Sequence, residues 1–583
     1  MQLLEVQVML KRVFSYMREY KKYAWSGLLC IGVEVVLEIA VPLLMADLID
    51  YGVTNADGTY IIKKGLQMAL CAVLALILGV GSAKFSALAG QGLGANIRKA
   101  EYEKLQSYSF SNIDHFSVSS LVTRLTSDVT NIQNAVSTGM RPFGRSPVML
   151  IFATSFAFRI NSTLALVFLV ALPTLAVLLI LIIINVGPLY GRMQSAIDQV
   201  NRCIQENLTA IRVVKSYVRG DYEVEKFGVV NENLKSESEK AFGTAVLNMP
   251  AMQFVMYGTI LGILLIGGRL INEGQMMIGQ LTSFLSYVLL ILNSLMMMSN
   301  VFLLMTRSLA SAERIMEVID EKIDITDENA KDIAVAKGEI EFDHVWFKYK
   351  DTAKEYVLSD VSFHIKPGQT VGIIGQTGSS KTTLVQLIPR LYDVTKGEVK
   401  IDGINVKEYP VRHLRDAVAM VLQKNTLFSG SLIDNLRWGN ENATLDEIKE
   451  ACQIACVDEF VDRLADGYDT EMGQEGVNVS GGQKQRICIA RAILKKPKVL
   501  ILDDSTSAVD TATEAKIRSG LAEKLPDMTK IIIAQRISSV RHADQIIIMD
   551  RGHVEAIGTH ESLLRDNQIY QEIYASQKEG ADL

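Results

Sequence analysis

The residues with the clearest chemistry lie in a glycine-containing loop that follows the apolar run TVGIIG. The loop and the residues after it comprise Gly375, Gln376, Thr377, Gly378, Ser379, Ser380, Lys381, Thr382 and Thr383. Strand, glycine loop and helix in that order are typical of a phosphate-binding loop. Successive backbone N–H groups can surround phosphate oxygens at the positive end of a helix, Lys381 supplies a charge, and Thr382 can ligate Mg²⁺. Ser380 departs from the usual pattern, because glycine is common there; serine keeps the backbone donor, so we expect nucleotide binding to survive if its Cβ fits.

Two further segments fit the same chemistry. The apolar run KVLILDD ends in Asp503, which suits water-mediated Mg²⁺ binding. Between the loop and this run lies VSGGQKQR, where Ser480, Gly481, Gly482 and Gln483 open a basic helix.

Composition indicates that part of the chain lies in a membrane. The 583 residues carry a net charge of −6, which gives no electrostatic reason to expect a nucleic-acid partner. Hydrophobic residues make up 49% of the chain, and mean hydropathy is +0.20, more apolar than a usual soluble enzyme. The six cysteines form no CxxC pair, so buried free thiols are expected rather than a disulfide framework or zinc site.

The first half contains six candidate membrane spans. Four have no Asp, Glu, Lys or Arg over a length that crosses a bilayer: 65–83, 161–191, 241–268 and 274–306. Two more, 23–50 and 136–158, are apolar but interrupted by charges. The stretch MLKRVFSYMREYKKY before them predicts an interfacial elbow helix. Basic residues before the first span and after the second place both chain ends in the cytoplasm.

From Ser308 the composition becomes charged and polar, and strand-like runs follow from GEIEFDHVWFKY. We therefore expect an all-α transmembrane domain of six helices followed by an α/β P-loop NTPase domain. The predicted segments are a cytoplasmic elbow helix at 1–22, the transmembrane domain at 23–307, a linker at 308–338 and the nucleotide-binding domain at 339–583.

With these motifs in this order, the chain resembles an ATP-binding-cassette (ABC) half-transporter of the exporter type, over almost its whole length. The resemblance implies ATP and Mg²⁺ as cofactors. It implies that Tyr349 stacks on adenine and that Gln423 contacts Mg²⁺ beside Thr382 and Asp503. It also implies that the SGGQ residues Ser480 to Gln483 contact ATP held by the opposite subunit, and that Ser507 to Asp510 form the D-loop.

The chain departs from this family at the two predicted catalytic positions. The residue after Asp503 is usually Glu, which polarises the attacking water, but here it is Asp504, one methylene shorter. In IIIAQRISS, Gln535 replaces the expected switch histidine; it can hydrogen-bond a phosphate but carries no positive charge. Hydrolysis at this site should be poor while ATP binding persists. The alternative is that both replacements are neutral drift and that Asp504 and Gln535 serve well enough in hydrolysis.

Similarity to the degenerate-site subunit of bacterial heterodimeric multidrug exporters implies a partner half-transporter that supplies the missing Glu and His. The expected function is ATP-driven export of small amphipathic or drug-like molecules across the cytoplasmic membrane. Alternatives are a peptide or lipid exporter, and an ATP-gated channel or regulatory subunit.

Two inner turns are candidate coupling segments, by position in the family: residues 112–120, and residues 213–222, which would dock on the partner. For the cargo, Glu34 and Glu38 lie one helical turn apart on the first span. They could bind a cationic drug or pair with Arg141 or Arg145, and the sequence leaves both open.

Overall fold

The computed structural model describes residues 2–504 and 509–579. The chain forms two compact units, one of residues Met1–Gln106 and Ser119–Asp320, the other of Ser107–Val118 and Glu321–Leu583.

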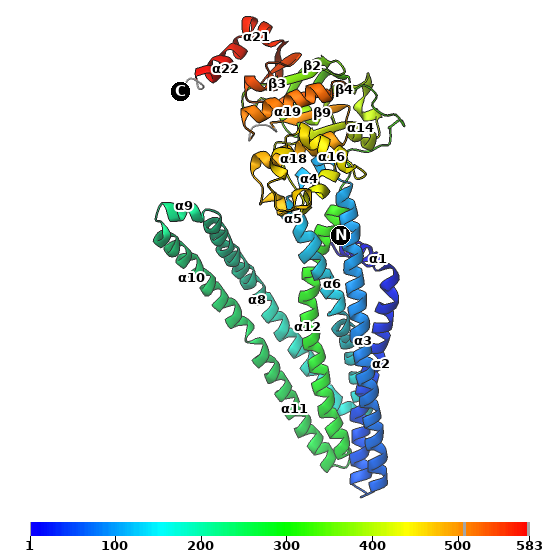
Figure 1. Ribbon diagram of the computed structural model, residues 1–583. Helices are drawn as coiled ribbons and strands as arrows, with labels where there is room; N and C mark the ends of the chain where they lie inside the picture. The colour runs from blue at the N-terminus through cyan, green and yellow to red at the C-terminus, as the bar shows by residue number, and fades with distance from the viewer. Residues whose placement is uncertain (1, 505–508, 580–583) are drawn as a thin grey trace. The chain divides into compact units, whose positions relative to one another are not determined.

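The first unit is built of helices. They are α1 (Gln2–Ser15), α2 (Lys21–Asp47), α3 (Gly58–Gln106), α5 (Val118–Thr123, which begins at the junction), α6 (Val129–Ser137), α7 (Met140–Ile160), α8 (Ser162–Thr209), α9 (Ile211–Ser216), α10 (Gly220–Ala245), α11 (Asn248–Asn272) and α12 (Ile278–Asp320). Helix α2 packs along α3, and α12 packs on α2, α6 and α7. Helix α10 runs back beside α8, with α9 at the tip of this pair (Figure 1).

Five helical stretches of the described chain are long and apolar enough to cross a membrane: Arg18–Val53, Gly58–Gln106, Ser162–Thr209, Gly220–Asn272 and Ile278–Met298. The sixth predicted span corresponds to α7. Its 21 residues reach about 30 Å. Because it contains three arginines, its mean hydropathy is lower, and it is not among these five apolar stretches.

The arginines of α7 pair with the acids of α2. Arg141 Nη2 lies 2.6 Å from Glu34 Oε1, and Arg145 lies 3.4 Å from Glu34 and 2.5 Å from Glu38. Glu34 is buried. The structure shows the pairing of these acids with arginine, which lowers the cost of charge within the membrane. Binding of a cationic drug by the same acids stays a prediction.

The second unit contains one short helix from the first half of the chain, α4 (Phe110–His115), and the fold of the second half. Its strands are β1 (Ile340–Phe347), β2 (Leu358–Ile365), β3 (Thr370–Ile374), β4 (Lys396–Ile401), β5 (Ile404–Asn405), β6 (Val418–Val421), β7 (Gly430–Ser431), β8 (Glu471–Met472), β9 (Val499–Asp503), β10 (Thr529–Ile533), β11 (Gln545–Asp550) and β12 (His553–Gly558). Its helices after α4 are α13 (Lys381–Gln386), α14 (Val411–Ala417), α15 (Leu432–Arg437), α16 (Leu445–Ile454), α17 (Asp458–Val461), α18 (Gly481–Leu494), α19 (Thr511–Lys524), α20 (Ile537–Val540), α21 (His560–Asp566) and α22 (Gln568–Glu579).

The main sheet brings the chemical motifs to one edge. Its strand order is β12-β11-β3-β10-β9-β6, and β11, β3, β10, β9 and β6 run parallel. The neighbours β3, β10 and β9 are pinned in register at Ile373, Ile533 and Asp503. The glycine loop, Gln535 and Asp504 follow directly, so they meet at the carboxyl ends of the strands, where α/β folds bind ligands.

Two hydrophobic cores cover the faces of this sheet. One lies between the sheet and helices such as α16 and α18, and the other lies under the antiparallel sheet β2-β1-β4-β5. Strands β9 and β10 are buried along their whole length, which explains their unbroken apolar sequence. The predicted fold class is confirmed, whereas the predicted segment boundaries stay predictions; helix α12 runs through the composition change at Ser308 and ends at Asp320.

Candidate nucleotide-binding site

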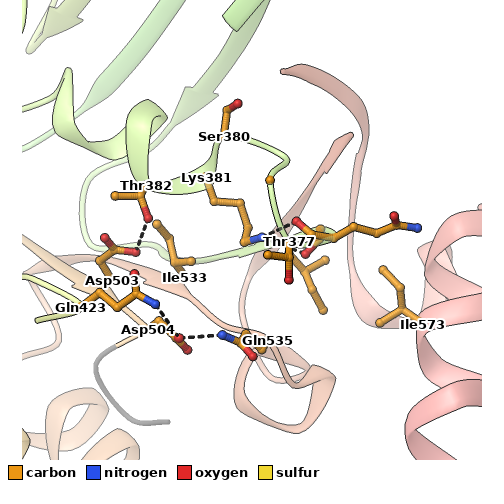
Figure 2. Close-up of a pocket in the computed structure, with 14 residues that line it drawn as sticks. Thr377, Ser380, Lys381, Thr382, Gln423, Asp503, Asp504, Ile533, Gln535 and Ile573 are labelled. Carbon is orange, nitrogen blue, oxygen red and sulfur yellow. Dashed lines mark hydrogen bonds between the residues drawn. The ribbon is translucent and has the colours of Figure 1, made fainter. Parts of the chain in front are cut away.

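A pocket of about 450 Å³ lies at the carboxyl ends of β3, β10 and β9 (Figure 2). Its lining residues are Ile374, Gly375, Gln376, Thr377, Gly378, Ser380, Lys381, Thr382, Gln423, Asp503, Asp504, Ile533, Gln535 and Ile573. Most of the positions predicted to bind nucleotide are therefore brought together.

The glycine loop connects β3 to α13 and wraps around Lys381. The Lys381 ammonium donates to the carbonyl oxygens of Gly375 at 2.8 Å and Gln376 at 2.9 Å, and lies 3.2 Å from the buried Ser379 hydroxyl. Burial lowers the pKa of Lys381, against the attraction of Asp504 and Asp503. A Cβ on Gly375 would lie 2.2 Å from the Met549 carbonyl oxygen, so glycine is required where the loop leaves the sheet.

Ser380 adopts the left-handed conformation, with φ +70° and ψ 24°. Glycine reaches this region without steric cost, whereas an L-residue with a Cβ does not. The serine hydroxyl points away from Lys381 and Thr382 (Figure 2). The Cβ of Ser380 is thus accommodated at a backbone cost.

Thr382 and Asp503 form the acidic part of the pocket. The Thr382 hydroxyl donates to Asp503 Oδ1 at 2.9 Å, and Asp503 Oδ2 is buried without a hydrogen-bond partner among the residues that the structure describes. Burial raises the pKa of the Asp503 carboxyl. A hydroxyl, a buried carboxylate oxygen that lacks a donor and the nearby Gln423 amide are oxygen ligands of the kind that Mg²⁺ prefers. These residues fit the predicted metal.

Two side chains that are far apart in the sequence, Gln423 and Gln535, converge on the Asp504 carboxylate. Gln535 Nε2 donates to Asp504 Oδ2 at 2.7 Å, and Gln423 Nε2 lies 3.5 Å from the same oxygen. Burial raises the pKa of Asp504, and the hydrogen bond from Gln535 opposes this shift. Two neutral amides therefore face the group that occupies the usual position of the catalytic base (Figure 2).

Tyr349 and Thr383 lie just outside the pocket lining. The Tyr349 hydroxyl is 2.9 Å from Thr383 Oγ1, and its ring packs edge-on against Phe347 and Tyr392. Burial raises the pKa of the Tyr349 hydroxyl. The residue is 44% exposed, so it retains surface for a planar ligand.

The SGGQ residues do not line this pocket. Ser480 caps α18: its hydroxyl accepts the Gln483 N–H, and the Gln483 side chain accepts the Ser480 N–H at 2.8 Å. Gly481 and Gly482 form the first turn. Of the predicted D-loop, residues 507 and 508 lie outside the described residues, while the Asp510 side chain accepts the Thr513 N–H and caps α19.

Three apolar lining residues were missed in the sequence. Ile374 and Ile533 end strands β3 and β10, a position that the strand pattern could have indicated. Ile573 comes from α22, far from every motif, and no sequence signal places it at the pocket.

Comparison with known proteins agrees with this architecture. Residues 25–295 match the family model described as ABC transporter transmembrane region, and residues 358–507 match the model described as ABC transporter. "Uncharacterized ABC transporter ATP-binding protein YfiB" of Bacillus subtilis (strain 168) is 38% identical over 98% of this chain and 100% of its own length. "Putative multidrug export ATP-binding/permease protein YgaD" of the same organism is 31% identical over 97% and 99%.

The fold is also that of a solved structure, "Structure of a bacterial Atm1-family ABC exporter with ATP bound". The TM-score is 0.81 at 23% identity, over 96% of this chain and 99% of that one. The chain belongs to the ABC transporter family as an exporter with a transmembrane region followed by a nucleotide-binding domain. The prediction of a multi-pass membrane ATPase coupled to transport is confirmed.

Proposed function

We propose that this chain is one half of a heterodimeric exporter and that it binds ATP at a site that hydrolyses it poorly. The proposal rests on the length and the contacts of the Asp504 side chain. This side chain is one methylene shorter than that of the usual Glu, and its carboxylate accepts a hydrogen bond from Gln535 at 2.7 Å. A base must reach its proton within roughly 2.6 to 3.2 Å, and a neutral amide cannot supply the charge of a protonated histidine.

The residues that grip the nucleotide fit their proposed roles. Backbone N–H groups from Gly378 to Thr383 would surround the phosphates, Lys381 would place a positive charge beside them, and Tyr349 would stack on adenine. Thr382, Gln423 and Asp503 would hold Mg²⁺, which screens phosphate charge when bound. Binding and hydrolysis are thus separated within one site.

The heterodimer follows from the intact SGGQ segment. Ser480 to Gln483 sit at the start of α18, away from the chain's own pocket. We propose that they complete the site of a partner half-transporter that carries the Glu and the His absent here. Two copies of this chain would contain two impaired sites.

The proposed cargo is a small amphipathic or drug-like molecule, exported across the cell membrane with both termini and the nucleotide-binding domain in the cytoplasm. Relatives named for multidrug export support this class. A cavity of about 820 Å³ within the helical unit supports this class too. Its lining is mostly apolar and includes Val41 and Leu290, and its charged members are Glu34, Glu38 and Arg141.

Purified full-length chain in lipid nanodiscs tests the first half of the proposal. We expect it to bind Mg²⁺-ATP, with a turnover roughly 10²-fold below the ~10 s⁻¹ typical of enzymes. Lys381→Ala is the control, and it should abolish binding. Rapid hydrolysis by a homodimer, verified by capture through two different tags, would contradict the proposal.

The partner is tested by isolating the tagged chain from its native cells at native abundance. A second half-transporter with Glu and His at the two positions should co-purify in equal amount. In a complex whose partner site is inactivated, Asp504→Glu with Gln535→His should raise hydrolysis by about 10²-fold. No gain from the double variant would show that Asp504 and Gln535 are not what limits this site.

A further inference from the structure

Helix α22 (Gln568–Glu579) contributes to the nucleotide site, although no motif predicts it there. Ile573 lines the pocket, and Gln577 lies one helical turn later on the same face. Figure 2 shows Ile573 on a helix at the edge of the pocket, facing the glycine loop. The segment that Gln577 contacts is the one that carries Gln535.

The Gln577 amide bridges two backbone groups on either side of Arg536. Its Oε1 accepts the Ile537 N–H at 2.8 Å, and its Nε2 donates to the Gln535 carbonyl oxygen at 2.8 Å. Only one orientation of an amide satisfies both partners, since one needs an acceptor and the other a donor. Ile537 is the first residue of α20, so its N–H has no partner within that helix.

These contacts form a continuous path to the reaction centre. Gln577 holds the backbone of Gln535, and the Gln535 side chain donates to Asp504 Oδ2 at 2.7 Å. The main-chain position of residue 535 is fixed on the other side by β10, which ends at Ile533 and pairs with β3 and β9. The loop between β10 and α20 is therefore tied at one end by the sheet and at the other by α22.

We propose that Gln577 is a positioning residue for the nucleotide site. It holds the switch segment 535–537 so that the Gln535 side chain stays directed at Asp504 and at the position of the terminal phosphate. The inference rests on the proposed function and adds one contact to it: the Gln535 amide would hydrogen-bond the terminal phosphate of the bound nucleotide. It makes α22 part of the apparatus that distinguishes a nucleoside triphosphate from a diphosphate.

The test compares a triphosphate with a diphosphate in the full-length chain. Equilibrium binding of Mg²⁺-AMP-PNP and Mg²⁺-ADP is measured in nanodiscs for wild type and Gln577→Ala. We expect the variant to weaken AMP-PNP binding about five- to tenfold, the size of one or two lost hydrogen bonds, with less than about a twofold change for ADP. A merely structural role would weaken both ligands alike, and that result would overturn the inference.

Gln571→Ala is the matched control. Gln571 lies on the same helix and also uses its amide on backbone groups, donating to the carbonyl oxygens of Leu564 and Arg565 at 2.9 and 3.0 Å. It should leave the ratio of AMP-PNP to ADP affinity unchanged. Gln577→Glu keeps the acceptor for the Ile537 N–H but places a carboxylate oxygen against the Gln535 carbonyl oxygen, and both are acceptors. It should therefore lower the ratio of AMP-PNP to ADP affinity at least as much as Gln577→Ala.

Gln535→Ala separates this inference from the proposed function. If that variant lowers the ratio but Gln577→Ala does not, the positioning role is wrong and the phosphate contact stands. If Gln535→Ala leaves the ratio unchanged, the proposed contact itself is wrong, and the inference falls with it.

Discussion

At the scale of single residues, Ser380 adopts the left-handed backbone conformation of the phosphate loop although it stands where glycine is usual. The residue sits at φ +70°, where an L-amino acid costs roughly 1–2 kcal/mol relative to the right-handed region. Its hydroxyl is directed away from the neighbouring pocket side chains in Figure 2. The loop therefore carries strain that gives the pocket no additional polar contact.

Ser380→Gly should stabilise the chain. Glycine removes the left-handed penalty but gains entropy in the unfolded state, so the expected net gain in the free energy of unfolding is about 0.5–1 kcal/mol. The measurement is the thermal midpoint of the full-length chain, together with Mg²⁺-AMP-PNP affinity, which should stay within about twofold of wild type.

Ser380→Ala is the control for that change, because it removes the hydroxyl and keeps the Cβ. It should give no stabilisation. A higher midpoint for alanine, or a lower one for glycine, would show that the hydroxyl and not the backbone decides the energy of this loop.

The residue pattern predicted part of the site and not the rest. The phosphate loop, Thr382 and Asp503 were predictable because each motif's local order reflects a backbone geometry that the chemistry needs. The meeting of Gln423 and Gln535 on Asp504 depends on which strands are neighbours, and the sequence does not state that order. Ile573 and Gln577 could not be predicted, because their place at the site is set by how α22 packs and not by any local pattern.

At the scale of elements, α4 is the part of the first half that packs with the second-half fold. Ser109 and Asn112 form a capping box that begins the helix. The Tyr392 hydroxyl donates to Asp114 Oδ2 at 2.6 Å, and the Phe110 ring packs edge-on against Tyr392 with centroids 6.1 Å apart. Burial and the hydrogen bond to Asp114 raise the pKa of Tyr392. One of the two candidate coupling segments, residues 112–120, thus begins within α4.

Tyr392→Phe should loosen α4 without disturbing the nucleotide pocket. The ring contact with Phe110 remains, but the hydrogen bond to Asp114 is lost. We expect hydrogen–deuterium exchange in residues 108–118 to rise about three- to tenfold, as for the loss of one hydrogen bond, with exchange in the loop 375–383 unchanged.

Tyr409→Phe is the matched control for this effect. The Tyr409 hydroxyl donates to the Ile401 carbonyl oxygen at 2.9 Å and not to a residue of α4. Exchange in residues 108–118 should not change in that variant. Equal exchange in wild type and Tyr392→Phe would mean that the tyrosine hydroxyl does not hold α4.

Element boundaries were less predictable than element types. The six apolar stretches and the strand–loop–helix unit follow from periodicity and length. The continuation of α12 to Asp320 could not be predicted in this way. A helix continues through a change of composition when its far end packs or is capped favourably. The assignment of α4 to the second unit depends in the same way on contacts with residues almost 300 positions away, such as Tyr392.

At the scale of the whole molecule, each unit presents an apolar surface that the described chain leaves exposed. At the tip of α8 and α10, Val213, Tyr217 and Val218 are 57%, 76% and 87% exposed. In the second unit, a groove of about 330 Å³ is lined by Phe428, Trp438 and residues of the adjoining strand and helix, and the two rings are stacked with centroids 4.1 Å apart. Exposed apolar and aromatic clusters of this kind mark interaction surfaces.

The segment around α9 is therefore expected to dock on the nucleotide-binding domain of the partner subunit. The partner's corresponding segment would occupy the groove beside Phe428. Ser216→Cys, bearing a short thiol-directed photo-cross-linker, should form a product with the partner in assembled complexes. Val229→Cys on α10, which is also exposed, is the control and should form little. Mass spectrometry of the product should locate the cross-link in the partner's nucleotide-binding domain. If cross-links formed only within one chain, α9 would contact its own nucleotide-binding domain, and the exposed tip would have to be explained without a docked partner.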